Sequence, residues 1–327
     1  MVSGPSPGCG YDAAVSAPEP ATAELPLLKT HHIVMGRLHR LHVQEFGVPG
    51  GRPAVVLHGG PGSGSSPLLR RGFDARRWRV VCIDQRGCGG STPRGEIEEN
   101  TTADLLNDLQ FVRRQLGIET WLVSGGSWGA TLALAYAAFE PQAVSALLLR
   151  ASFLARREDI EGFFGPAAAA QRPRAWQRLS RAYEAPLLPA LARALHHGAR
   201  AEQESAAAAW WAWEQALGNH IEDPPALVGE ALARQVARLR IQAHYLLRDC
   251  WLDNPPLPAL CAQVPRVPTV LLHARDDLIC PAAGAQALHA ALPHATLRWL
   301  ETGGHDASHP LMQAANAEAL AAFAGAA

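Results

Sequence analysis

The sequence lacks a long apolar run and an excess of charge of either sign. None of its hydrophobic stretches approaches the roughly 20 residues that a membrane-spanning helix needs. The 327 residues carry a formal net charge of −1. A chain so nearly neutral has no overall field that would draw it to nucleic acid or to an anionic membrane. We therefore expect neither nucleic acid nor a membrane as a partner.

Cysteines are also few, and they form no recognisable framework. The six cysteines include no C-x-x-C pair and no Cys/His spacing suited to zinc. Residues 1–26 lack a basic start followed by an apolar segment, so we expect no signal peptide there. Their Pro, Ala, Gly and Ser content is typical of a flexible lead-in or of a segment that lies on the surface. Together these absences make a cytoplasmic location the simplest expectation.

Short apolar runs alternate with helical patterns along most of the chain. Runs typical of buried parallel strands occur at residues 53–60, 78–84, 121–126, 144–150 and 267–274. Helical spacing lies between them, most clearly over 102–118 and 128–139. This alternation predicts an α/β fold with a mostly parallel, doubly wound sheet.

One long segment breaks the alternation. Residues 151–257 are rich in Ala, Arg and Trp, are mostly helical in period and contain no good buried strand. A helical block inserted into an α/β sheet is typical of a cap over the carboxyl ends of the strands, where such sheets bind ligands. We therefore expect a core in two parts, 27–150 and 258–327, with the cap inserted between them.

The stretch VSGGSWGAT, residues 123–131, joins an expected strand to an expected helix. Its glycines suit a plain turn. They also match G-x-S-x-G, the nucleophile elbow that exposes a serine, here Ser127. A base and an orienting acid would complete a serine triad in the order Ser, Asp, His. HARDDLICP supplies Asp276 and Asp277 after a strand, and TGGHDASH supplies His305 after the last strand. Each group has an ordinary alternative as a cap or a solvated loop residue, but their order and placement together favour the triad.

Two glycine-rich loops follow neighbouring strands. HGGPGSG, residues 58–64, offers backbone N–H groups that no side chain blocks. An acyl-transfer intermediate needs two such donors, which we assign to Gly60 and to Trp128, the residue after the serine. A phosphate loop is the alternative, but no Gly-Lys-Ser/Thr follows and no G-x-G-x-x-G is present. DQRGCGGSTP, residues 84–93, is interpreted as structural support beside the first loop.

An acidic residue stands on an aromatic helix face in the expected cap. WWAWEQAL, residues 210–217, places Trp210, Trp213, Glu214 and Leu217 on one side of a helix. This pattern is common where a helix packs in a cap with a charge at its rim. A carboxylate facing a closed pocket would instead bind the protonated amine of a substrate, and the pattern alone leaves both interpretations open.

Several motifs together resemble one family. HGGPG, DQRGCGGSTP, ENTT, GGSWGATLAL and the final GGH resemble the proline iminopeptidase (prolyl aminopeptidase) branch of the α/β-hydrolase superfamily, over nearly the whole chain from about residue 27. The resemblance implies an α/β-hydrolase fold and a cytosolic serine exopeptidase. It implies release of N-terminal proline, or another small residue, from peptides with a free N-terminus. It also implies that no metal or other cofactor is needed.

The resemblance also implies roles for particular residues. The family pattern Gly-Arg-x-Asp, two residues, Cys-Pro falls on residues 274–281, which makes Asp277 the triad acid, leaves Asp276 without a role and puts Cys280 near the site. W-x-x-W-E makes Glu214 the amine-binding residue. The positions of Arg150 and Phe153 match residues that line the substrate pocket.

One position departs from the family pattern. Where the family has R-I-E-N-H-Y, this chain has Arg240-Ile241-Gln242-Ala243-His244-Tyr245, so Gln242 replaces a second amine-binding carboxylate. A glutamine accepts a hydrogen bond from an amine but brings no charge. We expect weaker amine binding or a changed preference, which keeps an esterase or arylamidase on the same triad as the alternative function. A non-catalytic binding protein is less consistent with the sequence, because no member of the triad is missing.

Overall fold

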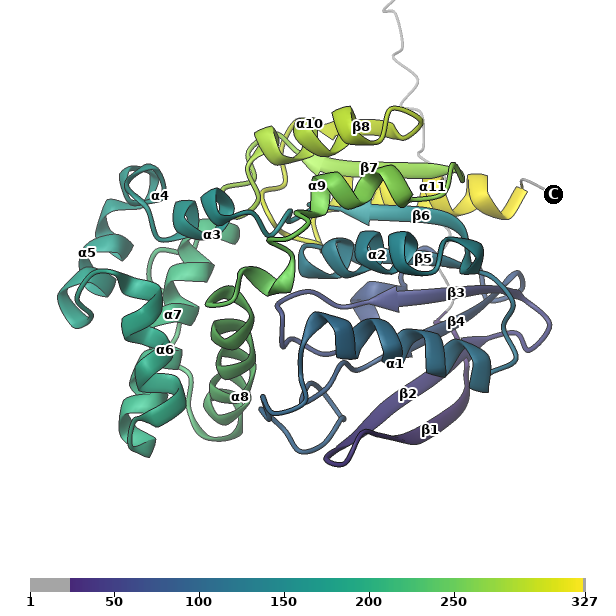
Figure 1. The fold of residues 1–327 in the computed structure, drawn as a ribbon. Coiled ribbons are helices and arrows are strands. Elements are labelled where there is room, and N and C mark those ends of the chain that lie inside the picture. The colour runs from purple at the N-terminus through teal and green to yellow at the C-terminus, as the bar shows by residue number, and fades with distance from the viewer. Residues whose placement is uncertain (1–23, 326–327) are drawn as a thin grey trace, which may run out of the picture.

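The structure is a computed structural model that describes residues 24–325, so most of the lead-in expected over residues 1–26 lies outside the described residues. Within the described range, eight strands form one sheet in the order β1-β2-β4-β3-β5-β6-β7-β8 (Figure 1). The strands are β1 Leu27–Met35, β2 His39–Gly47, β3 Arg52–Leu57, β4 Trp78–Ile83, β5 Trp121–Gly126, β6 Val144–Arg150, β7 Thr269–Ala274 and β8 Thr296–Leu300. β2 pairs antiparallel with β1 and β4, and all other pairs are parallel.

Helices cover both faces of this sheet and bury its central strands. These helices are α1 Thr102–Gln115, α2 Trp128–Phe139, α9 Leu257–Leu260, α10 Ala282–Ala291 and α11 Pro310–Gly325. Along β3, Val55 and Leu57 face the core that contains α1, α2 and α10, while Ala54 and Val56 face the core that contains α11. A strand buried on both faces is apolar at every position, which is why these runs could be found in the sequence. The predicted doubly wound, mostly parallel sheet is therefore confirmed.

The end of α1 agrees with the stop that the sequence indicates. The segment 102–118 has helical spacing with Gly117 as its expected stop, and α1 ends at Gln115 with Leu116 as its C-cap. Gly117 has φ +65°, a left-handed conformation that glycine adopts at little cost and that helices commonly use to end.

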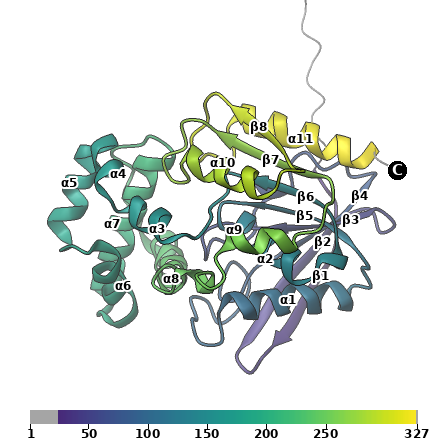
Figure 2. The same ribbon diagram turned by 45° about the horizontal axis from the view of Figure 1, so that its top comes forward.

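The chain leaves the sheet after β6 and returns to it at β7. In between it forms α3 Arg157–Phe163, α4 Pro166–Gln171, α5 Pro173–Ala182, α6 Leu187–His197, α7 Arg200–Gly218 and α8 Gly229–Leu246. These helices lie together beside the sheet, with α8 nearest to it (Figures 1 and 2). They make up the cap that we propose for residues 151–257.

Three glycines allow α8 to lie directly on the loops of the core. A Cβ atom on Gly62, whose φ is +104°, would stand 2.4 Å from the carbonyl oxygen of Arg238. One on Gly95 would stand 3.0 Å from the Cα atom of Ala237, and one on Gly87 would stand 2.9 Å from Ile241. Side chains at these positions would push the helix away. The glycines of the loops after β3 and β4 therefore fix α8 over the carboxyl ends of the strands.

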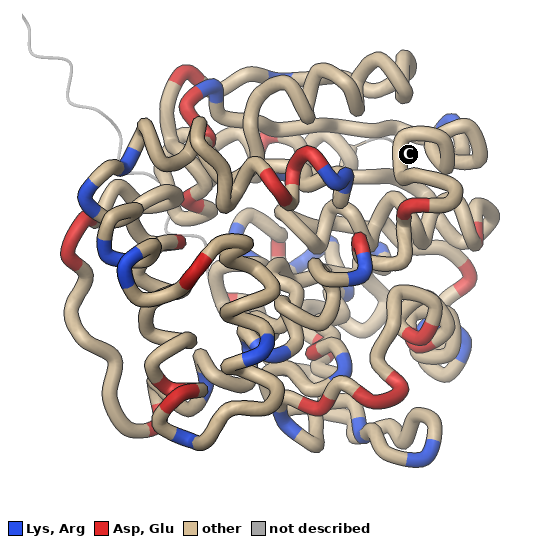
Figure 3. Tube along the Cα trace, turned by 60° about the vertical axis from the view of Figure 1, so that its left-hand side comes forward, with Lys and Arg blue, Asp and Glu red and all other residues tan. Residues whose placement is uncertain are grey.

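Charged residues are distributed without a large region of one sign. Figure 3 shows Lys and Arg interspersed with Asp and Glu on the side of the molecule where the cap comes forward. No helix in residues 24–325 is both long and apolar enough to cross a membrane.

Candidate active site

Ser127 stands on a strained turn between β5 and α2. Its φ of 55° and ψ of −126° lie where residues with a side chain are rarely found. A Cβ atom on Gly125 would lie 2.2 Å from the carbonyl oxygen of Gly129, and one on Gly129 would lie 2.2 Å from that of Leu57. The flanking glycines are therefore required for the strand and helix to meet this closely. This geometry is that of a nucleophile elbow and not of a plain turn.

His305 is oriented by Asp277. Its Nδ1 atom lies 2.8 Å from Oδ2 of Asp277. The other carboxylate oxygen of Asp277 accepts hydrogen bonds from the backbone N–H groups of Ile279 (2.9 Å) and Cys280 (2.8 Å). With Nδ1 held by the carboxylate, Nε2 is the nitrogen left to exchange a proton.

The neighbouring Asp276 has a different function. Its carboxylate accepts hydrogen bonds from the hydroxyl of Thr302 (2.7 Å) and the N–H of Gly304 (2.8 Å). These residues form the loop that carries His305. Asp276 thus fastens the loop, while Asp277 touches the imidazole. The family pattern left Asp276 without a role, whereas the structure shows that it holds the loop of His305 in place.

The environment of His305 favours its protonated form. Burial lowers the pKa of His305, but the negative charge of Asp277 and its hydrogen bond, with a contribution from Cys280, raise that pKa well above its ordinary value. Ser127 and His305 line the same cavity, although no hydrogen bond joins them among the described residues. A serine, a histidine and a buried aspartate from three separate loops therefore meet at the carboxyl ends of β5, β7 and β8.

The two expected oxyanion donors flank Ser127. Trp128 is the first residue of α2, where backbone N–H groups have no partner within the helix. The loop that carries Gly60 passes close by, since a Cβ atom on Gly59 would lie 3.4 Å from that of Ser127. This placement puts both loops beside the serine oxygen.

Gln85 connects the two loops that carry these donors. It accepts a hydrogen bond of 2.9 Å from the indole Nε1 of Trp128 and donates one of 3.0 Å to the carbonyl oxygen of His58. Its own N–H donates to Nε2 of His58 at 3.1 Å. The sequence identified this loop only as support, because nothing in DQRGCGGSTP indicates which side chain reaches across.

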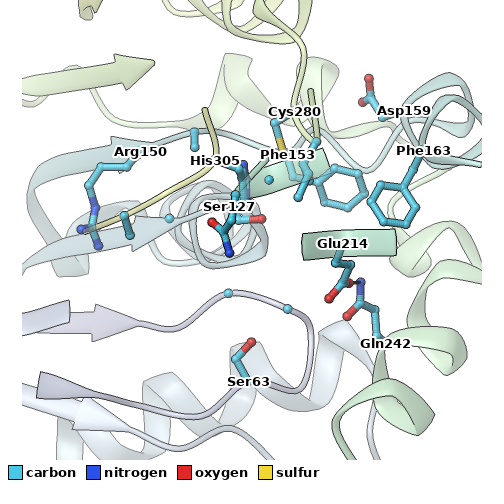
Figure 4. A pocket seen from close by; sticks show the side chains of 18 of the residues that line it. Ser63, Ser127, Arg150, Phe153, Asp159, Phe163, Glu214, Gln242, Cys280 and His305 are labelled. Carbon is cyan, nitrogen blue, oxygen red and sulfur yellow. Dashed lines mark hydrogen bonds between the residues drawn. The ribbon is translucent and has the colours of Figure 1, made fainter. Parts of the chain in front are cut away.

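A cavity of about 300 Å³ opens beside Ser127. Most of the expected site residues line it: Gly60, Ser127, Arg150, Phe153, Glu214, Gln242, Cys280 and His305 (Figure 4). Asp277 and Trp128 do not line the cavity. Asp277 is buried behind His305, and the ring of Trp128 packs edge-on against Tyr245 at 5.0 Å.

The residues of the aromatic face of α7 have different surroundings. Trp210 and Trp213 are almost fully buried. Trp210 packs against Phe164 at 5.2 Å, and the indole of Trp213 donates to the carbonyl oxygen of Phe163. Glu214, from the same face, reaches the cavity. The tryptophans therefore pack the cap, whereas the acid faces the cavity, and the amine-binding role of Glu214 stays a prediction.

Glu214 and Gln242 meet across two cap helices. Nε2 of Gln242 donates a hydrogen bond of 2.9 Å to Oε1 of Glu214 (Figure 4). The other carboxylate oxygen, Oε2, lies 2.6 Å from Nη2 of Arg238. The expected amine-binding residue is therefore in the cavity, and both of its oxygens already have a partner.

Comparison with known proteins agrees with this geometry. Residues 53–309 match the family model described as "alpha/beta hydrolase fold". The chain is 38% identical over 278 residues to a proline iminopeptidase of Xanthomonas citri, covering 83% of this chain and 89% of that protein. It is 38% identical over 295 residues to a probable proline iminopeptidase of Leptolyngbya boryana, covering 86% and 89%. A solved structure of proline iminopeptidase from Mycobacterium smegmatis has the same fold, with a TM-score of 0.61 at 20% identity over 90% of this chain and 99% of that one.

This chain belongs to the proline iminopeptidase family of α/β-hydrolases. The family membership expected from the sequence motifs is confirmed, as is the α/β-hydrolase fold.

Among the described charged residues that line the cavity, Arg150 is the one whose charge has no partner. Its side chain is buried, and none of its three guanidinium nitrogens has a hydrogen-bond partner among the described residues. Burial lowers the pKa of Arg150 to about 10. In Figure 4 it lies on the opposite side of Ser127 from Glu214. The guanidinium is directed away from Ser127 and its nitrogens are inaccessible, so Arg150 lines the cavity without presenting its charge there.

Cys280 lies beside the triad as expected for the family pattern. Its N–H holds Asp277, and its buried side chain lines the cavity. Burial raises the pKa of the Cys280 thiol, although the nearby His305 partly opposes this shift. The thiol is thus held mainly in its neutral form.

Two charged residues of the cavity were missed by the sequence reasoning. Arg238 stands one helical turn before Gln242 on α8, and Asp159 on α3 is held by Arg156 through bonds of 2.9 and 2.6 Å. The spacing of Arg238 and Gln242 was a usable signal, since residues four apart share a helix face. Nothing in the sequence indicated that Asp159 faces the site.

Proposed function

We propose that this protein is a serine aminopeptidase that releases N-terminal proline, or another small residue, from peptides with a free N-terminus. The observation that carries the proposal is that Ser127 and His305 line one small cavity together with Glu214, while Asp277 holds the imidazole from behind. The family membership supports the same reaction. Peptides are therefore the proposed substrates, and the reaction uses side chains and backbone groups without a metal or other cofactor.

In the proposed mechanism, Ser127 attacks the first peptide carbonyl while Nε2 of His305 takes its proton. Asp277 keeps the imidazole in the correct tautomer through Nδ1. The N–H groups of Gly60 and Trp128 donate hydrogen bonds to the oxyanion that forms. His305 then gives the proton to the leaving peptide amine, and a water molecule releases the first residue from the acyl-enzyme.

The shape of the cavity supports cleavage after the first residue only. Phe153 and Phe163 form an apolar wall against which a proline ring can pack. Glu214 lines the same cavity, and binding of the substrate's amine there would direct cleavage to the bond after the first residue.

The proposal is tested by comparing proline p-nitroanilide with its N-acetyl form, alanine p-nitroanilide and p-nitrophenyl acetate. Turnover of the free prolyl substrate, together with loss of activity on N-acetylation, supports an aminopeptidase. Faster turnover of the blocked or ester substrates would instead support the esterase or arylamidase alternative. A Ser127→Ala variant that folds but shows no turnover identifies the nucleophile, whereas surviving turnover would overturn that assignment. Covalent labelling of Ser127 by a serine-directed probe excludes a non-catalytic binding protein.

We also propose a cytoplasmic location. The five cysteines within residues 24–325 are all free and buried. Free thiols of this kind are typical of a reducing compartment. Measurement of free thiols in protein isolated from the producing cell tests the proposal, and disulfide-linked cysteines would contradict it.

A further inference from the structure

The cavity of this protein has no excess of negative charge, although its proposed ligand is the N-terminal ammonium group of a substrate. Among the described residues, its lining includes two acidic residues, Glu214 and Asp159, and two basic residues, Arg150 and Arg238. Asp159 is ion-paired with Arg156, which lies behind it. Glu214 is ion-paired with Arg238. No carboxylate of the lining is therefore left without a cationic partner.

The pairing at Glu214 is part of a closed set of three side chains. Nη2 of Arg238 reaches Oε2 of Glu214 at 2.6 Å and Oε1 of Gln242 at 3.0 Å. Gln242 in turn donates to Oε1 of Glu214 at 2.9 Å. Each side chain contacts the other two, and both Arg238 and Gln242 donate to the carboxylate of Glu214. The group in competition with a substrate amine is the guanidinium, because both are cations that seek the same oxygen.

We propose that Arg238 is a specificity-determining residue that competes with the substrate's N-terminal ammonium for Glu214. By holding this carboxylate, it lowers the preference of the cavity for a charged proline ring over an uncharged ring of the same shape. The inference deepens the proposed function and rests on it for one point only, that the substrate amine is directed at Glu214.

Several contacts hold the guanidinium of Arg238 beside Glu214. The backbone carbonyl of Arg238 packs against Gly62, so α8 cannot shift at this point without separating from the core. Nη1 of Arg238 is held by Gln235 at 3.0 Å. Its side chain is only 18% exposed, so water screens its charge incompletely. An ammonium bound at Glu214 would have the guanidinium as a close neighbour of the same sign, or would have to displace it.

The test is a binding measurement in the full chain carrying Ser127→Ala, which prevents turnover. Calorimetric titration compares L-prolinamide, a cation, with tetrahydrofuran-2-carboxamide, which has the same ring size and no charge. Arg238→Met removes the guanidinium and keeps an unbranched side chain of similar reach. Arg234→Met is the matched control, since Arg234 lies one turn earlier on α8, is 60% exposed and contacts Glu230. Arg238→Gln is a second variant that removes the charge and retains polarity, in case the methionine variant does not fold.

We expect Arg238→Met to raise the ratio of prolinamide affinity to neutral-amide affinity about tenfold, which corresponds to about 1.4 kcal/mol. Arg234→Met leaves this ratio unchanged. A ratio in Arg238→Met and Arg238→Gln that stays within about twofold of the parent, or that falls, would overturn the proposal. Because the readout is binding, it does not depend on turnover. Failure of the wild-type protein to release proline would overturn the proposed function. The effect of Arg238 on the affinity ratio would still be decided by the binding measurement alone.

Discussion

Gln242 donates a hydrogen bond of 2.9 Å to Glu214 from the adjacent helix α8. The family pattern has a carboxylate at the position of Gln242, so a neutral partner here replaces a second negative charge. The consequence is a cluster in which Arg238 balances Glu214, the carboxylate that we propose binds the substrate amine.

Gln242→Glu should therefore lower KM for proline p-nitroanilide. A second carboxylate beside Glu214 leaves a net negative charge after pairing with Arg238. A charge-assisted hydrogen bond is worth roughly 1 kcal/mol more than a neutral one, so we expect a decrease of about five- to tenfold. Steady-state kinetics checks this, with Gln171→Glu, an exposed position at the end of α4, as a control for added charge. An unchanged KM in Gln242→Glu would count against an electrostatic role for this position.

Substitutions of the two adjacent aspartates should have different effects on kcat and on stability. Asp277→Asn keeps the size of the side chain but removes the charge that orients His305, and we expect kcat to fall by about 10⁴-fold. Asp276→Asn weakens the hydrogen bonds to Thr302 and Gly304. It should lower the melting temperature and reduce kcat far less. Equal losses of kcat in the two variants would show that the structure assigns their roles wrongly.

The pH dependence of kcat/KM should follow the protonation of His305. The base must be neutral to accept the proton of Ser127, so activity rises as pH increases through the pKa of His305. Asp277 holds this pKa above its ordinary value, so the acidic limb of the profile should lie above about pH 6.5. In Asp277→Asn the acidic limb of the residual activity should shift to lower pH, because the negative charge that raises the pKa of His305 is gone. A midpoint that does not move in this variant would mean that another group controls the limb.

Gly62→Ala should destabilise the contact between α8 and the core. The new methyl group would meet the carbonyl oxygen of Arg238 at 2.4 Å, and the backbone has φ +104°. Gly117→Ala is the control, because Gly117 also has a positive φ, +65°, but nothing lies within 4 Å of a Cβ atom there. A non-glycine residue in a left-handed conformation costs roughly 1–2 kcal/mol, and overpacking adds roughly 1–3 kcal/mol. Chemical denaturation should show the larger loss for Gly62→Ala. Equal losses would mean that α8 does not depend on this close approach.

The parts of the fold that follow from local pattern were predictable from sequence. β5 and α2 begin and end where the apolar run, the glycines and the helical spacing placed them. The triad could be proposed because parallel strands bring their carboxyl ends to one edge of a sheet, whatever their separation in the chain. His305 and Asp277 meet for this reason, although they come from different loops.

Contacts that depend on how helices and loops pack could not be predicted in the same way. Arg238 reaches Glu214 only because α8 lies on Gly62 and beside α7. The helical spacing shows that Arg238 and Gln242 share a face, but not that this face meets α7. Gln85 likewise contacts Trp128, which is distant in the chain, and no local signal distinguishes it from the other residues of its loop.

The most direct test of the account is the release of free proline from a short unblocked peptide with N-terminal proline, measured by mass spectrometry beside its N-acetyl form. The account predicts that wild-type protein releases proline from the free peptide alone and leaves the remaining peptide intact. It also predicts that the Ser127→Ala variant releases none. Cleavage of the acetylated peptide at a similar rate, or internal cleavage without release of proline, would contradict an aminopeptidase that recognises the substrate amine at Glu214.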